Sequence, residues 1–242
     1  MRSDWTIAMR IHYLQHVPFE DLANIEAWAR SRGHDLSHTL LFSDESLPDM
    51  SGFDWLIIMG GPMNIYEHDR YPWLVREKEF IRQAISRGKI VLGICLGAQL
   101  ISDVLGGKVT RNRFREIGWF PVSLTSDGIA SSIFSVLPQR FVALHWHGDM
   151  FTIPPGAART AESEACLNQA FVLGRAIGLQ FHLESSKDSI DHLLQNCADE
   201  LTEGPYVQKP KDLAALPERY AQIQGLMEQL LDRIEMEFGQ KR

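Results

Sequence analysis

The sequence predicts an α/β fold built around a mostly parallel sheet, and two observations carry this prediction. Apolar runs of strand length alternate with stretches of helical periodicity, which is the rhythm of β-α-β units. A chain of 242 residues with 45% hydrophobic and 23% charged residues can also bury a sizeable core. The strand-like runs are Ile7–Tyr13, Leu40–Phe42, Trp55–Met59 and Ile90–Cys95.

Each pair of runs encloses a stretch whose apolar residues fall on one helical face. The first such helix ends near Gly33 and the second near Gly88, because glycine readily takes the left-handed conformation that closes a helix. The two apolar faces contain Phe19, Leu22, Ile25 and Ala29, and then Phe80, Ile81, Ala84 and Ile85.

A third helix is predicted over Leu96–Val104, and after it the pattern changes. Short apolar runs are separated by Gly, Pro and Asp turns, which indicates a small antiparallel insert. Its predicted strands are Lys108–Thr110, Trp119–Leu124, Phe141–Leu144, Ala158–Ala161 and Phe171–Leu173.

Ala176–Phe181 is predicted to return as a buried strand of the main sheet. The following helix has an apolar face formed by Ile190, Leu193, Leu194, Cys197 and Leu201. We therefore expect one domain over residues 1–203 and a C-terminal helical extension over residues 204–242. In that extension, apolar residues of Lys211–Phe238 recur every three or four positions, including a stripe from Tyr220 to Phe238. We favour packing of this stripe on the domain's own surface, with a homodimer contact as the alternative.

Charge and composition exclude several classes of function. The net charge of −7 has the wrong sign for holding nucleic acid or anionic lipid. The longest apolar stretches are too short for a membrane helix, and the N-terminus lacks a secretory signal, so we expect a cytoplasmic protein. Three cysteines without paired spacing predict neither a disulfide framework nor a metal site. Cys197 is expected in the core and Cys166 partly exposed.

The strongest chemical motif is Gly93-Ile-Cys95-Leu-Gly97, in which a buried strand leads directly into a helix. This is the thiol counterpart of the nucleophile elbow. Glycines flank the nucleophile because a sharp strand-to-helix turn leaves no room for side chains. The helix N-terminus lowers a thiol pKa, and the amide of Leu96 can hold a developing oxyanion. The alternative is a buried core cysteine.

Two further segments lie at predicted carboxyl ends of strands, where parallel sheets gather their active sites. His182 and Glu184 follow the returning strand, and residues two apart in extended backbone project to the same side. A cysteine nucleophile needs such an oriented base, although an isolated His-x-Glu is usually a surface pair. Gly60 and Gly61 end another strand and can leave backbone amides free for an oxyanion, or form a plain turn.

Taken together, Gly-Gly-Pro-Met at 60–63, Gly-Ile-Cys-Leu-Gly-Ala-Gln at 93–99 and Leu-Gln-Phe-His-Leu-Glu at 179–184 resemble the class I (triad) glutamine amidotransferases. The likeness is to free-standing proteins similar to the glutaminase domain of GMP synthetase. It implies a doubly wound, flavodoxin-like sheet and hydrolysis of the glutamine side-chain amide, with the ammonia passed to an acceptor. It implies neither a cofactor nor a metal.

The resemblance also implies a role for each matching residue. Cys95 would form a glutamyl thioester, His182 would protonate the departing ammonia and then activate water, and Glu184 would orient His182. The oxyanion would be held by the backbone amides of Gly61 and Leu96.

Substrate contacts are implied in the same way. Gly60 would shape the oxyanion loop, and Gln99 would contact the bound glutamine. His147, Gly148 and Asp149, expected after a strand, resemble a stretch whose backbone holds the substrate's α-amino and α-carboxylate groups. By sequence alone, His145 and His147 are more often ordinary loop or strand histidines.

The chain departs from the family pattern at Leu183, where proline is usual, and this leaves both functional side chains in place. No nucleotide-binding motif follows, so the ammonia acceptor is expected to be a separate synthetase subunit, with the absence of any acceptor as the alternative. Alternatives are a γ-glutamyl peptide hydrolase with the same triad and a non-catalytic regulatory subunit. Charged residues of the insert would clamp a carboxylate-rich substrate or form a solvated loop: Lys108, Arg111, Arg113, Arg115 and Glu116.

Overall fold

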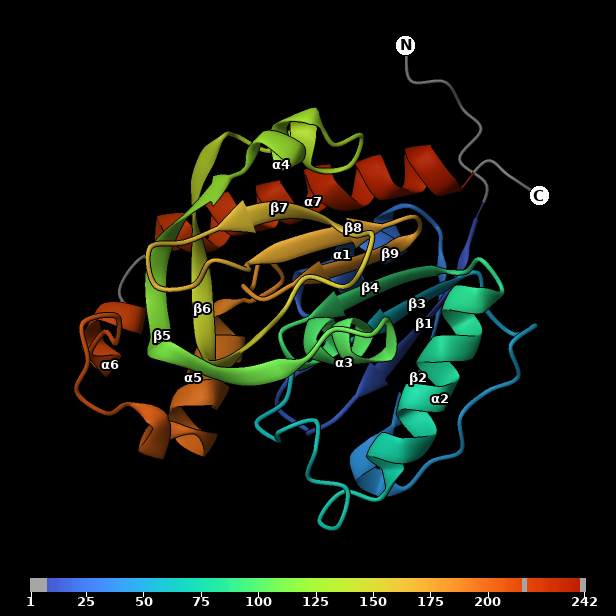
Figure 1. The fold of residues 1–242 in the computed structure, drawn as a ribbon, viewed down its shortest axis with the longest axis horizontal. Coiled ribbons are helices and arrows are strands. Elements are labelled where there is room, and N and C mark those ends of the chain that lie inside the picture. Colours follow the sequence, from blue (N-terminus) through green and yellow to red (C-terminus); the bar gives the residue numbers. More distant parts are fainter. Residues whose placement is uncertain (1–7, 215–216, 240–242) are drawn as a thin grey trace.

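The protein is built around one mixed β-sheet with helices on both faces (Figure 1), and the computed structural model describes residues 8–214 and 217–239. Five strands are parallel: β2 (Asp35–Leu40), β1 (Arg10–Gln15), β3 (Trp55–Ile58), β4 (Ile90–Ile94) and β9 (Ala176–Leu179). Antiparallel strands continue the sheet beyond β9 in the order β8 (Ala170–Leu173), β7 (Ala158–Glu162), β5 (Val109–Leu124) and β6 (Arg140–Phe151). The predicted fold class is confirmed.

Helices α1 (Asn24–Ser31) and α7 (Pro217–Phe238) cover one face of the sheet, and α2 (Trp73–Ser86) and α3 (Leu96–Val104) cover the other. Alternate residues of a strand point to opposite faces, so Ile57 belongs to the first apolar cluster and Ile58 to the second. Each such buried side chain contributes about 1.5–3 kcal/mol. Burial on both faces explains the continuous apolar runs of the central strands.

The second strand was placed wrongly by the sequence pattern. The predicted run Leu40–Phe42 is mostly a 3₁₀ turn, Leu41–Ser43, and β2 precedes it. β2 pairs only with β1 at the sheet edge, and its side chains are largely exposed. An edge strand therefore needs no apolar run, and a polar one resists pairing with other chains. The first predicted strand began at Ile7, which lies outside the described residues.

The insert has longer strands than expected. The predicted runs 108–110 and 119–124 belong to a single strand, β5, whose pairing with β6 shifts register between Arg111 and Glu116. β6 continues past Leu144, so the segment expected to follow a strand, His147 to Asp149, lies within it. Charged side chains in the middle of β5 concealed its continuity, because alternation there is broken by the irregular register.

The C-terminal segment packs against the same sheet. Short helix α6 (Pro210–Ala214) precedes α7, whose apolar stripe is buried in the first cluster beside α1. This confirms the favoured packing of the stripe on the domain's own surface and removes the stripe as a dimer contact. The domain boundary near residue 203 stays a prediction. The remaining helices are α4 (Ser126–Ala130) and α5 (Lys187–Asn196).

Candidate active site

Cys95 stands at the sharp turn between β4 and α3. It is 6% exposed, its φ is 51° and its ψ is −105°, a strained conformation for a residue with a side chain. Its amide donates to the Leu179 carbonyl oxygen at 2.7 Å, which fixes the turn on β9. A β-carbon on Gly93 would collide with the Gly97 backbone, and one on Gly97 with the Ile58 carbonyl. Both glycines of the motif are therefore required by packing.

His182 and Glu184 form a buried pair just beyond β9. The Nδ1 of His182 lies 2.6 Å from Glu184 Oε1. His182 also pairs with Leu144 through backbone hydrogen bonds, its amide donating at 2.8 Å. Where the family usually has proline, the Leu183 carbonyl accepts from the side-chain amide of Asn24 at 2.8 Å. A hydrogen bond from α1 thus restrains the segment in proline's place.

The protonation of the cysteine and the histidine is coupled. Burial lowers the pKa of His182, but the Glu184 carboxylate and the Cys95 sulfur raise it by more, so its pKa lies well above the ordinary value. Burial raises the pKa of the Cys95 thiol, and interaction with His182 opposes this increase. The expected lowering of the thiol pKa is therefore wrong, because the cost of desolvating the thiolate exceeds its favourable interaction with His182. The imidazolium of His182 is the group that favours the thiolate.

The loop after β3 is fixed by a buried ion pair between His16 and Glu77, which carries no sequence motif. His16 lies 2.9 Å from the Gly60 carbonyl oxygen through Nδ1 and 2.8 Å from Glu77 Oε1 through Nε2. A β-carbon on Gly61 would lie 2.9 Å from Leu96 Cδ2, so this loop packs directly on the start of α3. Gly61 and Cys95 line the same pocket, and Leu96 follows Cys95 directly in the chain.

The predicted substrate residues lie on the other side of Cys95. Gln99, one turn along α3, donates to Gln180 Oε1 at 3.3 Å. His147 lies 3.1 Å from the Asp149 carbonyl oxygen through Nδ1. Asp149 accepts from the Asn64 side-chain amide at 2.7 Å, which connects β6 to the loop after β3.

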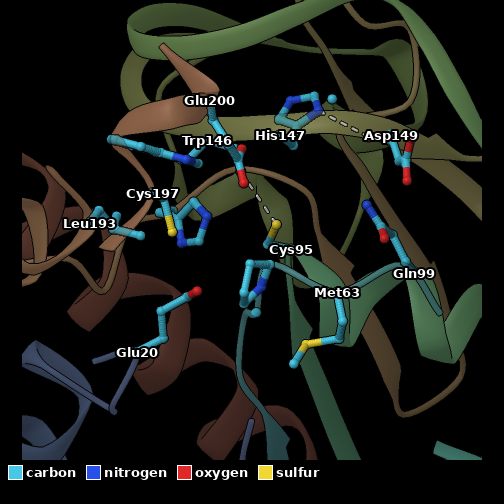
Figure 2. Close-up of a pocket in the computed structure, with 14 residues that line it drawn as sticks. Glu20, Met63, Cys95, Gln99, Trp146, His147, Asp149, Leu193, Cys197 and Glu200 are labelled. Atoms are coloured by element: carbon cyan, nitrogen blue, oxygen red, sulfur yellow. Dashed lines mark hydrogen bonds between the residues drawn. The ribbon is translucent and has the colours of Figure 1, made fainter. Parts of the chain in front are cut away.

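These residues surround a pocket of about 510 Å³ (Figure 2). Of the predicted site residues, Gly61, Cys95, Gln99, His147, Gly148, Asp149 and His182 line it directly. Gly60 and Glu184 line a narrow adjoining cavity with room for about one water molecule. Pro62 and Met63 of the Gly-Gly-Pro-Met motif also line the larger pocket, as does Leu193 from the predicted apolar helical face. Three lining residues had no predicted role: Glu20, Trp146 and Glu200. Cys197 is buried as expected but faces the pocket.

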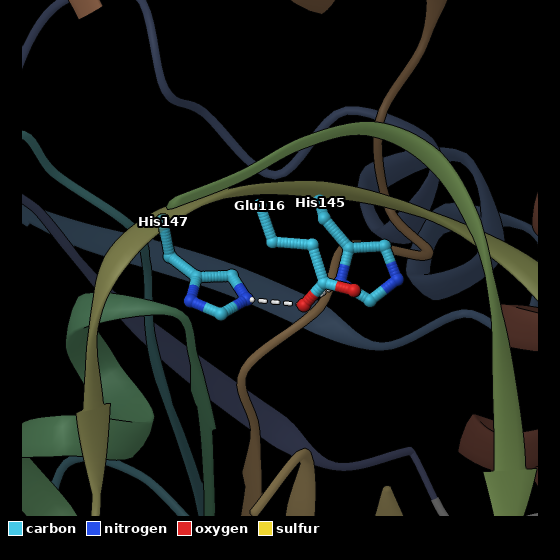
Figure 3. A group of neighbouring side chains, drawn as sticks. All are labelled: Glu116, His145 and His147. Atoms are coloured by element: carbon cyan, nitrogen blue, oxygen red, sulfur yellow. Dashed lines mark hydrogen bonds and ion pairs between the residues drawn. The ribbon is translucent and has the colours of Figure 1, made fainter. Parts of the chain in front are cut away.

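Glu116, His145 and His147 form a group whose ligand-type atoms all lie within 4.8 Å of one another (Figure 3). Such donors suit zinc. However, Glu116 Oε2 already accepts from Gln169 Nε2 at 2.7 Å and from Ser163 Oγ at 3.1 Å, and it lies 3.1 Å from His147 Nε2. We therefore interpret the group as a hydrogen-bond network that holds His147.

Electrostatics agree with this interpretation. Burial alone would raise the pKa of the Glu116 carboxyl, but the two histidines hold it far below its ordinary value. Burial lowers the pKa of His145. Glu116 is therefore a buried carboxylate within β5 that has internal partners, so for this residue both the substrate clamp and the solvated loop are wrong.

The three arginines of the same stretch line a separate groove of about 820 Å³ that shares Gly148 with the active-site pocket. Arg111 and Arg113 are exposed, whereas Arg115 donates to the Glu200 carbonyl oxygen at 2.6 Å.

The expected partial exposure of Cys166 is wrong. The residue is 2% exposed, and its amide donates to Ser163 Oγ.

Comparisons with known proteins agree with this geometry. Residues 23–201 match the family model of glutamine amidotransferase class I. A relative from Salmonella typhimurium, named as a putative glutamine amidotransferase-like protein, is 30% identical over 96% of this chain and all of its own length. GMP synthase (glutamine-hydrolysing) from Thermomicrobium roseum is 36% identical over 53% of this chain. The match spans only 23% of that enzyme.

Solved structures show the same fold over nearly the whole chain. A glutamine amidotransferase from Thermotoga maritima is 33% identical with a TM-score of 0.86, covering 95% of this chain and 99% of its own. One from Methylobacillus flagellatus is 26% identical with a TM-score of 0.89, covering 98% of both chains. Within the described residues, no helix combines the length and apolar character needed to cross a membrane. The resemblance found in the sequence is confirmed, and the chain belongs to the class I glutamine amidotransferases.

Proposed function

We propose that this protein hydrolyses the side-chain amide of glutamine, or of a related γ-glutamyl compound, with Cys95 as the nucleophile. The observation that carries the proposal is the pairing of a cysteine on a strained elbow with the buried His182–Glu184 pair in one pocket. The non-catalytic alternative gives no reason to maintain such strain, which costs about 1–3 kcal/mol.

The reaction begins when the Cys95 thiolate attacks the carboxamide carbon. The oxyanion that forms accepts hydrogen bonds from the amides of Gly61 and Leu96. His182 then gives its proton to the departing nitrogen, and the C–N bond breaks to leave a glutamyl thioester. Glu184 keeps the imidazole oriented through Nδ1, so that Nε2 serves the proton transfer.

Water completes the cycle. His182, now neutral, removes a proton from the water that attacks the thioester, and the thiolate leaves with release of glutamate. In this proposal the acyl chain lies toward Gln99 and the segment from His147 to Asp149. The ammonia acceptor is proposed to be a separate synthetase subunit.

A second candidate is hydrolysis of a γ-glutamyl amide with a leaving group larger than ammonia. The observation in its favour is that the pocket continues past Cys95 and His182 to Glu20, Leu193 and Cys197, on the side away from Gln99 and Asp149. A γ-glutamyl peptide hydrolase is one form of this candidate.

The test is the release of product from glutamine and from γ-glutamyl dipeptides by the purified protein. Cys95→Ala is the blank, and Cys166→Ala is the matched control because that thiol lies outside the pocket. Ammonia released from glutamine only when Cys95 is present would support the first candidate. Cleavage of dipeptides alone would support the second, and Cys95-independent turnover would contradict both.

A further inference from the structure

The carboxyl group of Glu20 lies beside His182, on the side of Cys95 away from the predicted acyl site. A β-carbon on Gly60 would collide with Glu20 Oε2 and would lie 3.5 Å from His182 Cε1, so both groups border the same small space. Figure 2 shows Glu20, Leu193 and Cys197 on one side of the Cys95 sulfur and Gln99 and Asp149 on the other. The pocket thus has two ends.

The end that faces Glu20 receives the leaving group, and this step rests on the proposed function. His182 Nε2 is buried and has no hydrogen-bond partner among the described residues. It is the atom that would protonate the departing nitrogen. A substituent on that nitrogen extends away from the acyl chain, and so toward Glu20, Leu193 and Cys197, which line the same pocket.

Among the described residues no Lys or Arg is paired with Glu20, and the positive groups that act on its carboxyl are the imidazoles of His182 and His16. The pocket lining contains the carboxylates of Glu20, Asp149 and Glu200, and none of its described lining residues is Lys or Arg. Burial raises the pKa of Glu20 to about 7; His182 and His16 oppose this, whereas Glu184 and Glu200 add to it. A ligand cation would relieve this unfavourable environment.

An apolar wall lies between the two glutamates at this end. Leu193 and Cys197 lie between Glu20 and Glu200 in Figure 2, beside the Trp146 side chain. These side chains suit a short methylene chain, and the carboxylates suit a charge at its end.

We propose that the preferred substrate is a γ-glutamyl amide whose leaving group is an alkyl diamine, with its free ammonium bound by Glu20. Cys95 forms the thioester as the C–N bond breaks, and the departing nitrogen takes the proton of His182. The diamine leaves, and water then releases glutamate and restores the thiolate. Glutamine is the same substrate without the alkyl chain.

The test compares kcat/KM for N-(γ-glutamyl)-1,4-diaminobutane with that for N-(γ-glutamyl)butylamine, which has the same chain without the charge. We expect wild-type protein to prefer the cationic compound by tenfold or more. Glu20→Gln should reduce this preference to about one. Glu26→Gln, at an exposed carboxylate on α1, removes the same charge and should keep it. The matching anion, N-(γ-glutamyl)-4-aminobutanoate, should be the poorest substrate.

Inhibition of the wild-type protein tests the same inference even if Glu20→Gln does not fold. Free 1,4-diaminobutane should inhibit glutamine hydrolysis at a concentration at least tenfold lower than butylamine does. Equal turnover of the cationic and neutral amides, or a preference that survives Glu20→Gln, would overturn the inference while leaving the proposed function intact. Failure to hydrolyse any of the amides, glutamine included, would overturn both.

Discussion

Replacing Cys95 with glycine is expected to stabilise the fold relative to replacement with alanine. The backbone at this position has φ 51° and ψ −105°, which alanine tolerates no better than cysteine. Such a conformation costs about 1–3 kcal/mol for a residue with a β-carbon. Glycine avoids this cost but loses about 0.5–1 kcal/mol through the greater freedom of the unfolded chain. The central values of these two ranges, about 2 and about 0.75 kcal/mol, give a net gain of about 1 kcal/mol for Cys95→Gly over Cys95→Ala, with an upper bound of about 2.5 kcal/mol.

Urea and thermal unfolding of the two variants measure this difference. For a chain of this size, about 1 kcal/mol corresponds to a Tm difference of roughly 2–4 °C. Ala98→Gly, three residues along the same helix, is the matched control because its backbone is helical, and it should lose about 1 kcal/mol. If Cys95→Ala is as stable as Cys95→Gly, the turn stores no strain and the reasoning is refuted.

Gly97→Ala is expected to lower the free energy of unfolding by about 3 kcal/mol or more in urea, because its β-carbon meets backbone. Gly225→Ala, in open space on α7, should raise it by about 0.5–1 kcal/mol, and equal effects would contradict the packing argument. Iodoacetamide at pH 8 should label Cys95 at least tenfold faster than Cys166. Burial raises the pKa of both thiols, that of Cys166 to about 12, but Cys95 lines the pocket beside the His182 imidazolium, whereas Cys166 lies outside it. Equal labelling in peptide mapping would argue against an activated thiol. The depressed pKa of Glu116 contributes stability above its ordinary value of 4.5 that is lost as the pH falls toward the folded-state pKa. Wild-type Tm should therefore fall more steeply than that of Glu116→Gln between pH 6 and pH 3, and parallel curves would count against the network.

Much of the fold was predictable because the central strands are buried on both faces. Their apolar runs, and the glycines around Cys95, leave a local signal that needs no knowledge of the rest of the chain. The edge strand β2 and the continuity of β5 were missed because polar edge strands and shifted registers carry no such signal.

The residues of the candidate site also fall into two groups: those that lie in local sequence motifs and those placed by contacts between distant segments. Cys95, His182 and Glu184 were found because each follows a buried strand in a recognisable motif. Glu20, His16 and the partners of Glu116 were not, because their roles depend on contacts between distant segments. His16 and Glu77, for example, are 61 residues apart. Long-range pairs of this kind are visible only once the chain is folded.

The central claim is that Cys95 carries the glutamyl group, and trapping this intermediate tests it most directly. Hydroxylamine added during turnover of glutamine should intercept a thioester and give γ-glutamylhydroxamate. Wild-type protein is predicted to form the hydroxamate, and Cys95→Ala is predicted to form none. Ammonia release by wild-type protein without hydroxamate, or hydroxamate formed by Cys95→Ala, would contradict a thioester on Cys95.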